Sequence, residues 1–309
     1  MNNVGQHLLS GGLSGFASTI CLQPFDLLKT RVQQRDGKIT AQNAQGVLRI
    51  ARDIFATEGM TGLWRGTTPT LFRNVPGVAL YMTGLTQVRT LLARSPLFAS
   101  LRIPVQSERT THASVLPKLS PQGNLLAGAA TRVGVGLLLN PFSLLKARFE
   151  SNIYQYQSFP RAFASILRSG PSELLKGAIP SAMRDAPYAG IFVACYEVIK
   201  RETGSLSAQT SVVSATAVHT CSAASAGAIA TLVTQPFDVI KTKVQVRRED
   251  RYHGLRRTVA TIWQQRGVRG FFDGSVLRIS RKVFSSAIGW AVYEGLLIFL
   301  DTTGRKTRT

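Results

Sequence analysis

Hydrophobic residues are concentrated in six long stretches that alternate with shorter polar segments. Three of these stretches are rich in Gly, Ala, Ser and Leu and lie at 8–23, 125–140 and 219–235. The other three, also apolar, lie at 68–92, 179–200 and 276–299. A short segment with helical spacing of apolar residues, such as 47–55, separates the two members of a pair. The pattern therefore predicts, in each third of the chain, a long helix, a loop, a short amphipathic helix and a second long helix.

The long stretches are typical of membrane helices that are apolar on one side only. None contains the roughly 20 consecutive apolar residues that a fully lipid-exposed span requires. Small residues at a spacing of four, as in Gly11 with Gly15 and Ala223 with Gly227, allow helix backbones to approach closely in lipid. We therefore expect helices that face lipid on one side and a watery cavity on the other.

A motif around a proline occurs three times, at the end of the first long stretch of each third. Gln-Pro-Phe-Asp-Leu-Leu-Lys-Thr-Arg at 23–31 has counterparts at 140–148 and 235–243. A second motif, Glu-Gly-Met-Thr-Gly-Leu-Trp-Arg-Gly at 58–66, has counterparts at 169–177 and 266–274. Because proline removes a backbone hydrogen bond, each first helix is expected to kink at its motif. Two motifs repeated in the same register predict three tandem repeats.

The chain is strongly basic, yet it carries few charged residues. Lys and Arg number 37 against 16 Asp and Glu, a net charge of +21, while 17% of residues are charged and 44% are hydrophobic. A nucleic-acid-binding repeat protein would need aromatic stacking platforms and a solvated Lys/Arg face. The long Gly-rich apolar stretches argue against such a surface. The composition therefore favours a membrane protein, with no nucleic-acid partner.

Cysteine and histidine give no sign of a metal or catalytic site. Cys21, Cys195 and Cys221 form no Cys-x-x-Cys pair, and the four histidines are scattered. No Ser/His/Asp constellation emerges, so we expect neither enzyme activity nor a cofactor nor a metal. The N-terminus lacks a basic segment followed by a long apolar core, so we do not expect a cleaved signal.

The two motifs resemble the signature of the mitochondrial carrier family. That signature is Pro-x-Asp/Glu-x-x-Lys/Arg-x-Lys/Arg followed by Asp/Glu-Gly, four residues, an aromatic residue, Lys/Arg and Gly; the first repeat matches it throughout. The resemblance implies an all-α membrane protein whose repeats, at 1–110, 111–205 and 206–309, each contain two transmembrane helices and a short matrix amphipathic helix. It also implies a six-helix barrel with pseudo-threefold symmetry. Such a carrier is a functional monomer that crosses the mitochondrial inner membrane as a multi-pass protein.

The resemblance further implies a matrix gate, in which the acid of one repeat pairs with the base of the next. Proline brings the three motif ends together at one mouth, where these charges meet. The pairs expected here are Asp26–Lys146 and Asp238–Lys29.

The third pair of the matrix gate is incomplete. Ser143 stands where the second repeat would carry its acid, so Lys241 is expected to face a hydroxyl group. Gln33 and Gln245, four residues beyond the lysines, could brace the gate through hydrogen bonds. Glu150 fills the corresponding position in the second repeat.

A second, outer gate is implied on the even-numbered helices. Glu197 and Lys200 match the aromatic-acid-x-x-base pattern of the family, whereas the first repeat retains only the base and the third only the acid. Under the same cyclic pairing, Glu294–Arg89 is the one intact outer pair. Two matrix pairs against one outer pair favour a resting state that is open to the intermembrane space.

Charged residues also lie inside the predicted even-numbered spans, where charge is costly and usually functional. By resemblance these positions face the central cavity and contact the substrate: Arg73, Arg184, Asp185, Arg281 and Lys282. An adjacent Arg and Asp suit a zwitterion, because Arg binds a carboxylate and Asp binds an ammonium group. Arg132 could face the same cavity or extend towards a helix end.

Three glycines precede the second long helices, namely Gly66, Gly177 and Gly274. Free N–H groups and the helix dipole at such positions favour an anion. The family resemblance makes that anion the phosphate of cardiolipin, although simple turn glycines would fit the same positions.

The substrate is expected to be a small amino acid. The segments at 22–34, 184–191 and 233–245 are similar to the members of the family that carry glycine into the matrix for haem biosynthesis. A carrier of another small metabolite, a keto acid or a nucleotide, remains the alternative.

Overall fold

The structure, a computed structural model, describes residues 3–35, 44–94, 120–206, 212–285 and 288, and its regular structure within these ranges is helical. The first repeat contains α1 (Asn3–Gln34), α2 (Ala44–Glu58), the 3-10 helix η1 (Met60–Trp64) and α3 (Thr67–Ala93). The second contains α4 (Pro121–Leu138), α5 (Asn140–Glu150), α6 (Phe159–Arg168), α7 (Pro171–Leu174) and α8 (Ala178–Leu206). The third contains α9 (Val212–Val233), α10 (Gln235–Val246), η2 (Asp250–Tyr252), α11 (Leu255–Arg266), η3 (Gly267–Phe272) and a helical segment at 275–285.

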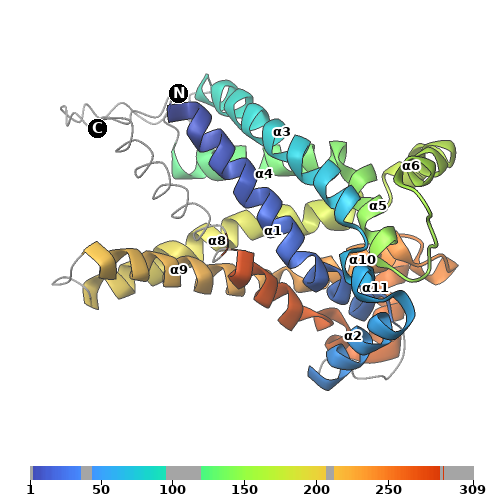
Figure 1. Cartoon of the computed structure of the whole chain (residues 1–309). Helices are drawn as coiled ribbons and strands as arrows, with labels where there is room; N and C mark the ends of the chain where they lie inside the picture. The colour runs from blue at the N-terminus through green and yellow to red at the C-terminus, as the bar shows by residue number, and fades with distance from the viewer. Residues whose placement is uncertain (1–2, 36–43, 95–119, 207–211, 286–287, 289–309) are drawn as a thin grey trace, which may run out of the picture.

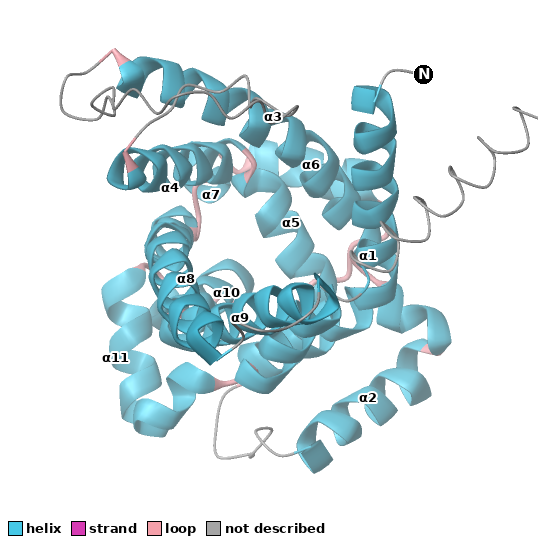
Figure 2. Cartoon of the chain, turned by 90° about the vertical axis from the view of Figure 1, so that its left-hand side faces the viewer, coloured by secondary structure: helices cyan, strands magenta, loops and turns pink. Residues whose placement is uncertain are grey.

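The long helices converge at one end of the molecule and diverge at the other (Figure 1). The short elements α2, α6 and α11 gather with α5 and α10 at the convergent end. Viewed from the divergent end, α1, α3, α4, α8 and α9 are arranged in a ring (Figure 2). The motif segments of the three repeats therefore meet at the convergent end.

Proline breaks the first long helix of the second and third repeats. The axis bends by 65° between α4 and α5 and by 56° between α9 and α10. Pro141 and Pro236 are the second residues of α5 and α10, where a missing N–H removes no helical hydrogen bond. Two of the three predicted kinks are thus confirmed.

The first repeat differs, because α1 continues through Pro24. Pro24 has no N–H to donate to the carbonyl of Ile20, four residues earlier. The indole Nε1 of Trp64 donates to that oxygen instead, at 2.9 Å. A side chain of the second motif thus replaces the backbone hydrogen bond that the proline of the first motif removes.

No single described helix is both long and apolar enough to cross a membrane. The pairs α4 with α5 and α9 with α10 reach the necessary length and composition only when each pair is taken together.

Three hydrophobic clusters, one for each repeat, hold the amphipathic helices against the motif segments. Leu27 and Val32 of α1 pack with Ile50 and Ile54 of α2. The second cluster joins α5 to α6, and the third joins α10 to α11. Burying one such aliphatic side chain contributes about 2 kcal/mol. The clusters fix the rotation of each motif helix, and so decide which of its side chains turn towards the other repeats.

Candidate functional site

Two ion pairs join the first repeat to its neighbours at the convergent end. The Lys29 ammonium lies 2.5 Å from Asp238 Oδ2, and the Lys146 ammonium lies 2.5 Å from Asp26 Oδ2. Both pairs expected from the motifs are therefore present. They tie α1 to α10 and α5 respectively, so the three motif helices are linked across the axis of the ring.

The glutamine at the first brace position does contact a gate carboxylate. Gln33 donates from Nε2 to Asp238 at 3.1 Å, and its oxygen accepts a hydrogen bond from the Thr242 hydroxyl at 2.7 Å. Gln245, by contrast, donates to the backbone carbonyl of Lys176 at 3.3 Å. No acid stands at Ser143, so Gln245 has no third ion pair to brace.

Glu150 takes the brace position in the second repeat. Its carboxylate accepts hydrogen bonds from Thr30 at 2.6 Å and Gln23 at 3.1 Å. It also lies 3.7 Å from the Lys146 ammonium, which is shared with Asp26. The junction of the first and second repeats therefore contains two acids around one lysine.

Lys241 differs from the other two gate lysines. Its side chain is only 7% exposed, and within the described part of the chain it makes no hydrogen bond or ion pair. Ser143, the hydroxyl residue expected to face Lys241, lines the same cavity but forms no hydrogen bond with it in the part of the chain that the structure describes. The physical reason is the missing acid, since a hydroxyl group exerts no long-range attraction on an ammonium group.

A cavity of about 220 Å³ lies immediately behind these pairs. All five residues predicted to contact the substrate line it, and so do the gate lysines and carboxylates. Arg184 pairs with Asp185 at 2.8 Å and with Asp238 at 3.0 Å. Arg281 pairs with Asp26. The predicted substrate arginines thus share carboxylates with the predicted matrix gate, a connection that the motifs did not indicate.

Two further cations line the cavity. Arg132 is one of them, and its guanidinium lies 5.9 Å from the centre of the Tyr81 ring, so the cavity-facing alternative is the correct one. Sequence reasoning missed Arg278, which donates to Thr231 O, Gln235 Oε1 and Thr234 Oγ1 at 3.1 to 3.2 Å. Arg278 stands four residues after the repeat glycine, where the other repeats carry a small hydroxyl residue. Aligning the repeats one position at a time would have singled it out.

The outer gate is only partly within the described residues. Arg89 donates to the Asn124 side chain at 2.6 Å. Glu197 is exposed and forms no ion pair with any residue that the structure describes. Glu294 and the side chain of Lys200 lie outside the described residues, so the predicted pair Glu294–Arg89 stays a prediction.

Each of the three repeat glycines adopts a backbone conformation that favours glycine. The φ angles are 92° for Gly66, 78° for Gly177 and 73° for Gly274. Each glycine packs against the brace residue of the next repeat. A Cβ atom would lie 3.0 Å from Glu150 at Gly66, 2.6 Å from Gln245 at Gly177 and 3.5 Å from Gln33 at Gly274.

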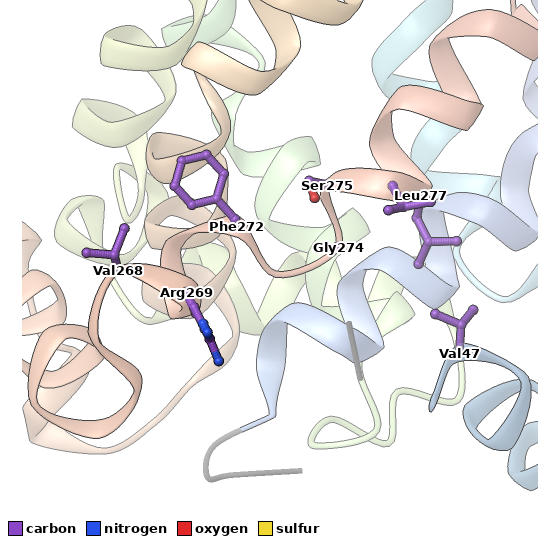
Figure 3. Close-up of a pocket in the computed structure, with 8 residues that line it drawn as sticks. Val47, Val268, Arg269, Phe272, Gly274, Ser275 and Leu277 are labelled. Carbon is purple, nitrogen blue, oxygen red and sulfur yellow. The ribbon is translucent and has the colours of Figure 1, made fainter. Parts of the chain in front are cut away.

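A second pocket, of about 350 Å³, lies beside Gly274 (Figure 3). Val47 of α2 faces it from the first repeat, and Val268, Arg269 and Phe272 of η3 line it from the third. The walls are mainly apolar, and Arg269 and the start of the helical segment at 275–285 supply its positive charge and N–H groups. This arrangement suits a molecule with an anionic head and apolar chains.

Acids of the second motif neutralise the last cation of the first motif within the same repeat. Glu58 pairs with Arg31 at 2.5 Å and with Arg65 at 3.3 Å, and Glu173 pairs with Arg148. Partial burial acts to raise the pKa of Glu58, but the two arginines outweigh it and hold that pKa below its ordinary value. These pairs fix each motif helix to the loop that follows the amphipathic helix.

The sequence and this geometry agree with a known family. The family model described as "Mitochondrial carrier protein" matches residues 1–96, 117–205 and 213–303. The chain belongs to the mitochondrial carrier family. As a member, it is a mitochondrial membrane protein with three repeats, and the ion pairs of the convergent end join the recurring motif segments of those repeats.

Relatives match the carrier over nearly its whole length. A protein of Laccaria bicolor, named mitochondrial glycine transporter, is 63% identical over 308 residues, which cover 98% of this chain and 100% of the relative. A protein of the same name from Mycosarcoma maydis is 38% identical, covering 93% of this chain and 82% of the relative. One from Aspergillus niger is 40% identical, covering 94% and 89%.

Proposed function

We propose that this carrier transports glycine across the mitochondrial inner membrane into the matrix, where glycine is used for haem biosynthesis. The observation that carries the proposal is the adjacent Arg184 and Asp185 at the wall of the charged cavity. A small zwitterion offers one charge to each of these side chains. Relatives that match nearly the whole chain are named mitochondrial glycine transporter, which supports the same substrate.

The transport mechanism that we propose is alternating access in a six-helix barrel that works as a monomer. In the described conformation the cavity is bounded on the convergent side by Lys29–Asp238 and Lys146–Asp26. We assign that side to the matrix, because the family motif places its gate there. Arg184 and Arg281 line the cavity and also pair with the gate carboxylates. A substrate carboxylate would therefore compete with Asp238 and Asp26 for these two arginines. Such competition would loosen the matrix gate when substrate is bound.

We also propose that cardiolipin binds where one repeat meets the next. Gly274 and the pocket beside it provide N–H groups for a phosphate and apolar walls for acyl chains. Gly66 and Gly177 occupy the equivalent positions of the other repeats and are proposed to bind in the same way. Cardiolipin should therefore raise the melting temperature of the purified carrier. An equal melting temperature in cardiolipin and in a neutral lipid would contradict this assignment.

Competition in proteoliposomes tests the substrate. Uptake of labelled glycine should be inhibited by unlabelled glycine, and much less by a keto acid, which lacks the ammonium group, or by a nucleotide of several negative charges. The physical reason is Asp185, which favours an ammonium group and opposes additional negative charge. Stronger inhibition by the keto acid or the nucleotide than by glycine would replace the proposal with a carrier of that metabolite.

A further inference from the structure

Lys241 lies in the wall of the cavity, on α10, without a counter-charge of its own. Its side chain is 7% exposed and makes no hydrogen bond or ion pair with any residue that the structure describes. Ser143, 8% exposed, stands where the motif of the first and third repeats has an acid. An ammonium group that faces a cavity and forms no ion pair within the described residues attracts an anion to this position.

The other gate lysines and the carboxylates of the wall already have ion-pair partners. Lys29 and Lys146 hold Asp238 and Asp26, and Arg184 is shared between two carboxylates. Nine cationic and four anionic side chains line the cavity in the part of the chain that the structure describes. The imbalance leaves positive charge in excess, and Lys241 is the buried gate cation to which no acid is assigned.

Four charged side chains near Lys241 would also act on an anion bound there. The charged groups that act on Lys241 are Arg184 and Arg73, both repulsive, and then Asp185 and Asp238, both attractive. Arg73 likewise makes no hydrogen bond or ion pair within the described residues, and it lines the same cavity. A carboxylate beside Lys241 would relieve the repulsion from Arg73 and Arg184. An ammonium group one carbon away could then face Asp185.

We propose that Lys241 binds the carboxylate of the transported amino acid. The substrate then supplies the negative charge that Ser143 does not, so that Lys241 has a carboxylate partner only while the substrate is bound. Lys241 is thereby a substrate-specificity residue in addition to its place in the gate. The inference rests on the proposed function, because it takes a small amino acid as the substrate.

Proteoliposome uptake with a pair of competitors tests this role. Glycine and glycinamide share the ammonium group, but only glycine has a carboxylate. The wild-type carrier and Lys241→Arg should prefer glycine to glycinamide as an inhibitor of labelled glycine uptake. Lys241→Gln should lose about tenfold or more of that preference, the amount expected for one charge-assisted hydrogen bond. An unchanged preference in Lys241→Gln would overturn the proposal.

Substitution of Ser143 provides an independent test that leaves Lys241 in place. Ser143→Asp supplies an internal partner for Lys241, so the KM for glycine should rise about tenfold. Ser143→Asn is the matched control, because it adds similar volume without charge, and its KM should lie well below that of Ser143→Asp. Folding of each variant is checked by its melting temperature. An unchanged KM in folded Ser143→Asp would overturn the proposal even if Lys241→Gln failed to fold.

Failure of the proposed function can be told apart from failure of this inference. If the wild-type carrier takes up no glycine, the proposed substrate is wrong, and the lysine is tested by thermal shift with acetate against acetamide. Acetate should then stabilise the wild-type carrier but not Ser143→Asp, in which the lysine is already paired. Equal stabilisation of both proteins, or of neither, would remove Lys241 as a carboxylate site.

Discussion

Replacing Asp238 with asparagine should shift the carrier towards its matrix-open state. The Asp238 side chain is 1% exposed and accepts hydrogen bonds from Lys29 at 2.5 Å, Arg184 at 3.0 Å and Gln33 at 3.1 Å. Asparagine keeps the size of the side chain but removes its charge. In the closed state Lys29 then loses its counter-charge and Arg184 loses one of its two carboxylate partners, while in the open state water solvates all of these groups.

The size of the shift follows from the burial of this carboxylate. Removing one partner of a buried pair costs roughly 3–5 kcal/mol, against about 0–1 kcal/mol for an exposed pair. Asp238 is buried, but its cations line a watery cavity, so we take the lower bound of about 3 kcal/mol. A change of that size multiplies the ratio of matrix-open to matrix-closed carrier by about 150.

Cysteine labelling from each side of the membrane measures this ratio. A single cysteine at Ala147, which lines the cavity, serves as the reporter after the natural cysteines are replaced by serine. Matrix-side labelling should be slow in the otherwise wild-type carrier and much faster with Asp238→Asn. Asp53→Asn is the matched control, because Asp53 is 59% exposed and lies 3.8 Å from Arg35. Equal matrix-side labelling rates with and without Asp238→Asn would refute the reasoning.

Two further predictions concern stability. The pKa of Glu58 lies below its ordinary value in the folded carrier, so its ion pairs stabilise the fold above about pH 4.5 and lose that effect as the pH falls through the folded pKa. On acidification, the melting temperature of Glu58→Gln should therefore change less than that of the wild-type carrier. Parallel curves of melting temperature against pH for the two proteins would contradict this. Gly177→Ala should lower the melting temperature more than Gly170→Ala. Both glycines have positive φ, but only the new methyl group at Gly177 meets a neighbour, Gln245 at 2.6 Å. An equal loss of melting temperature in the two variants would exclude steric crowding.

The contacts that depend only on the spacing of the repeated motifs along the chain could be predicted from the sequence. The pairs Lys29–Asp238 and Lys146–Asp26 follow from motifs that recur in register, because equivalent positions on equivalent helices must meet when three repeats close into a ring. The kink at Pro236 follows from the chemistry of proline, which cannot donate a backbone hydrogen bond.

The remaining contacts depend on how helices of different repeats lie against one another. Arg184 reaches Asp238 on α10, a contact that no spacing along α8 reveals. Arg278 donates to the Thr231 carbonyl and the Thr234 hydroxyl at the bend between α9 and α10, so its partners depend on where the bend lies. Trp64 compensates for the N–H that Pro24 lacks, and α1 continues through this proline as one helix. Side chains that satisfy a broken backbone are visible only once the break has been placed in three dimensions.

Uptake of labelled glycine by liposomes that contain the purified wild-type carrier or Asp185→Asn tests the proposed function most directly. The wild-type carrier should accumulate glycine above protein-free liposomes. Asp185→Asn, folded and with an unchanged melting temperature, should fall to near that background, because the ammonium group loses its counter-charge. Wild-type uptake no faster than protein-free liposomes would contradict glycine transport, and normal uptake by folded Asp185→Asn would remove this carboxylate from the site.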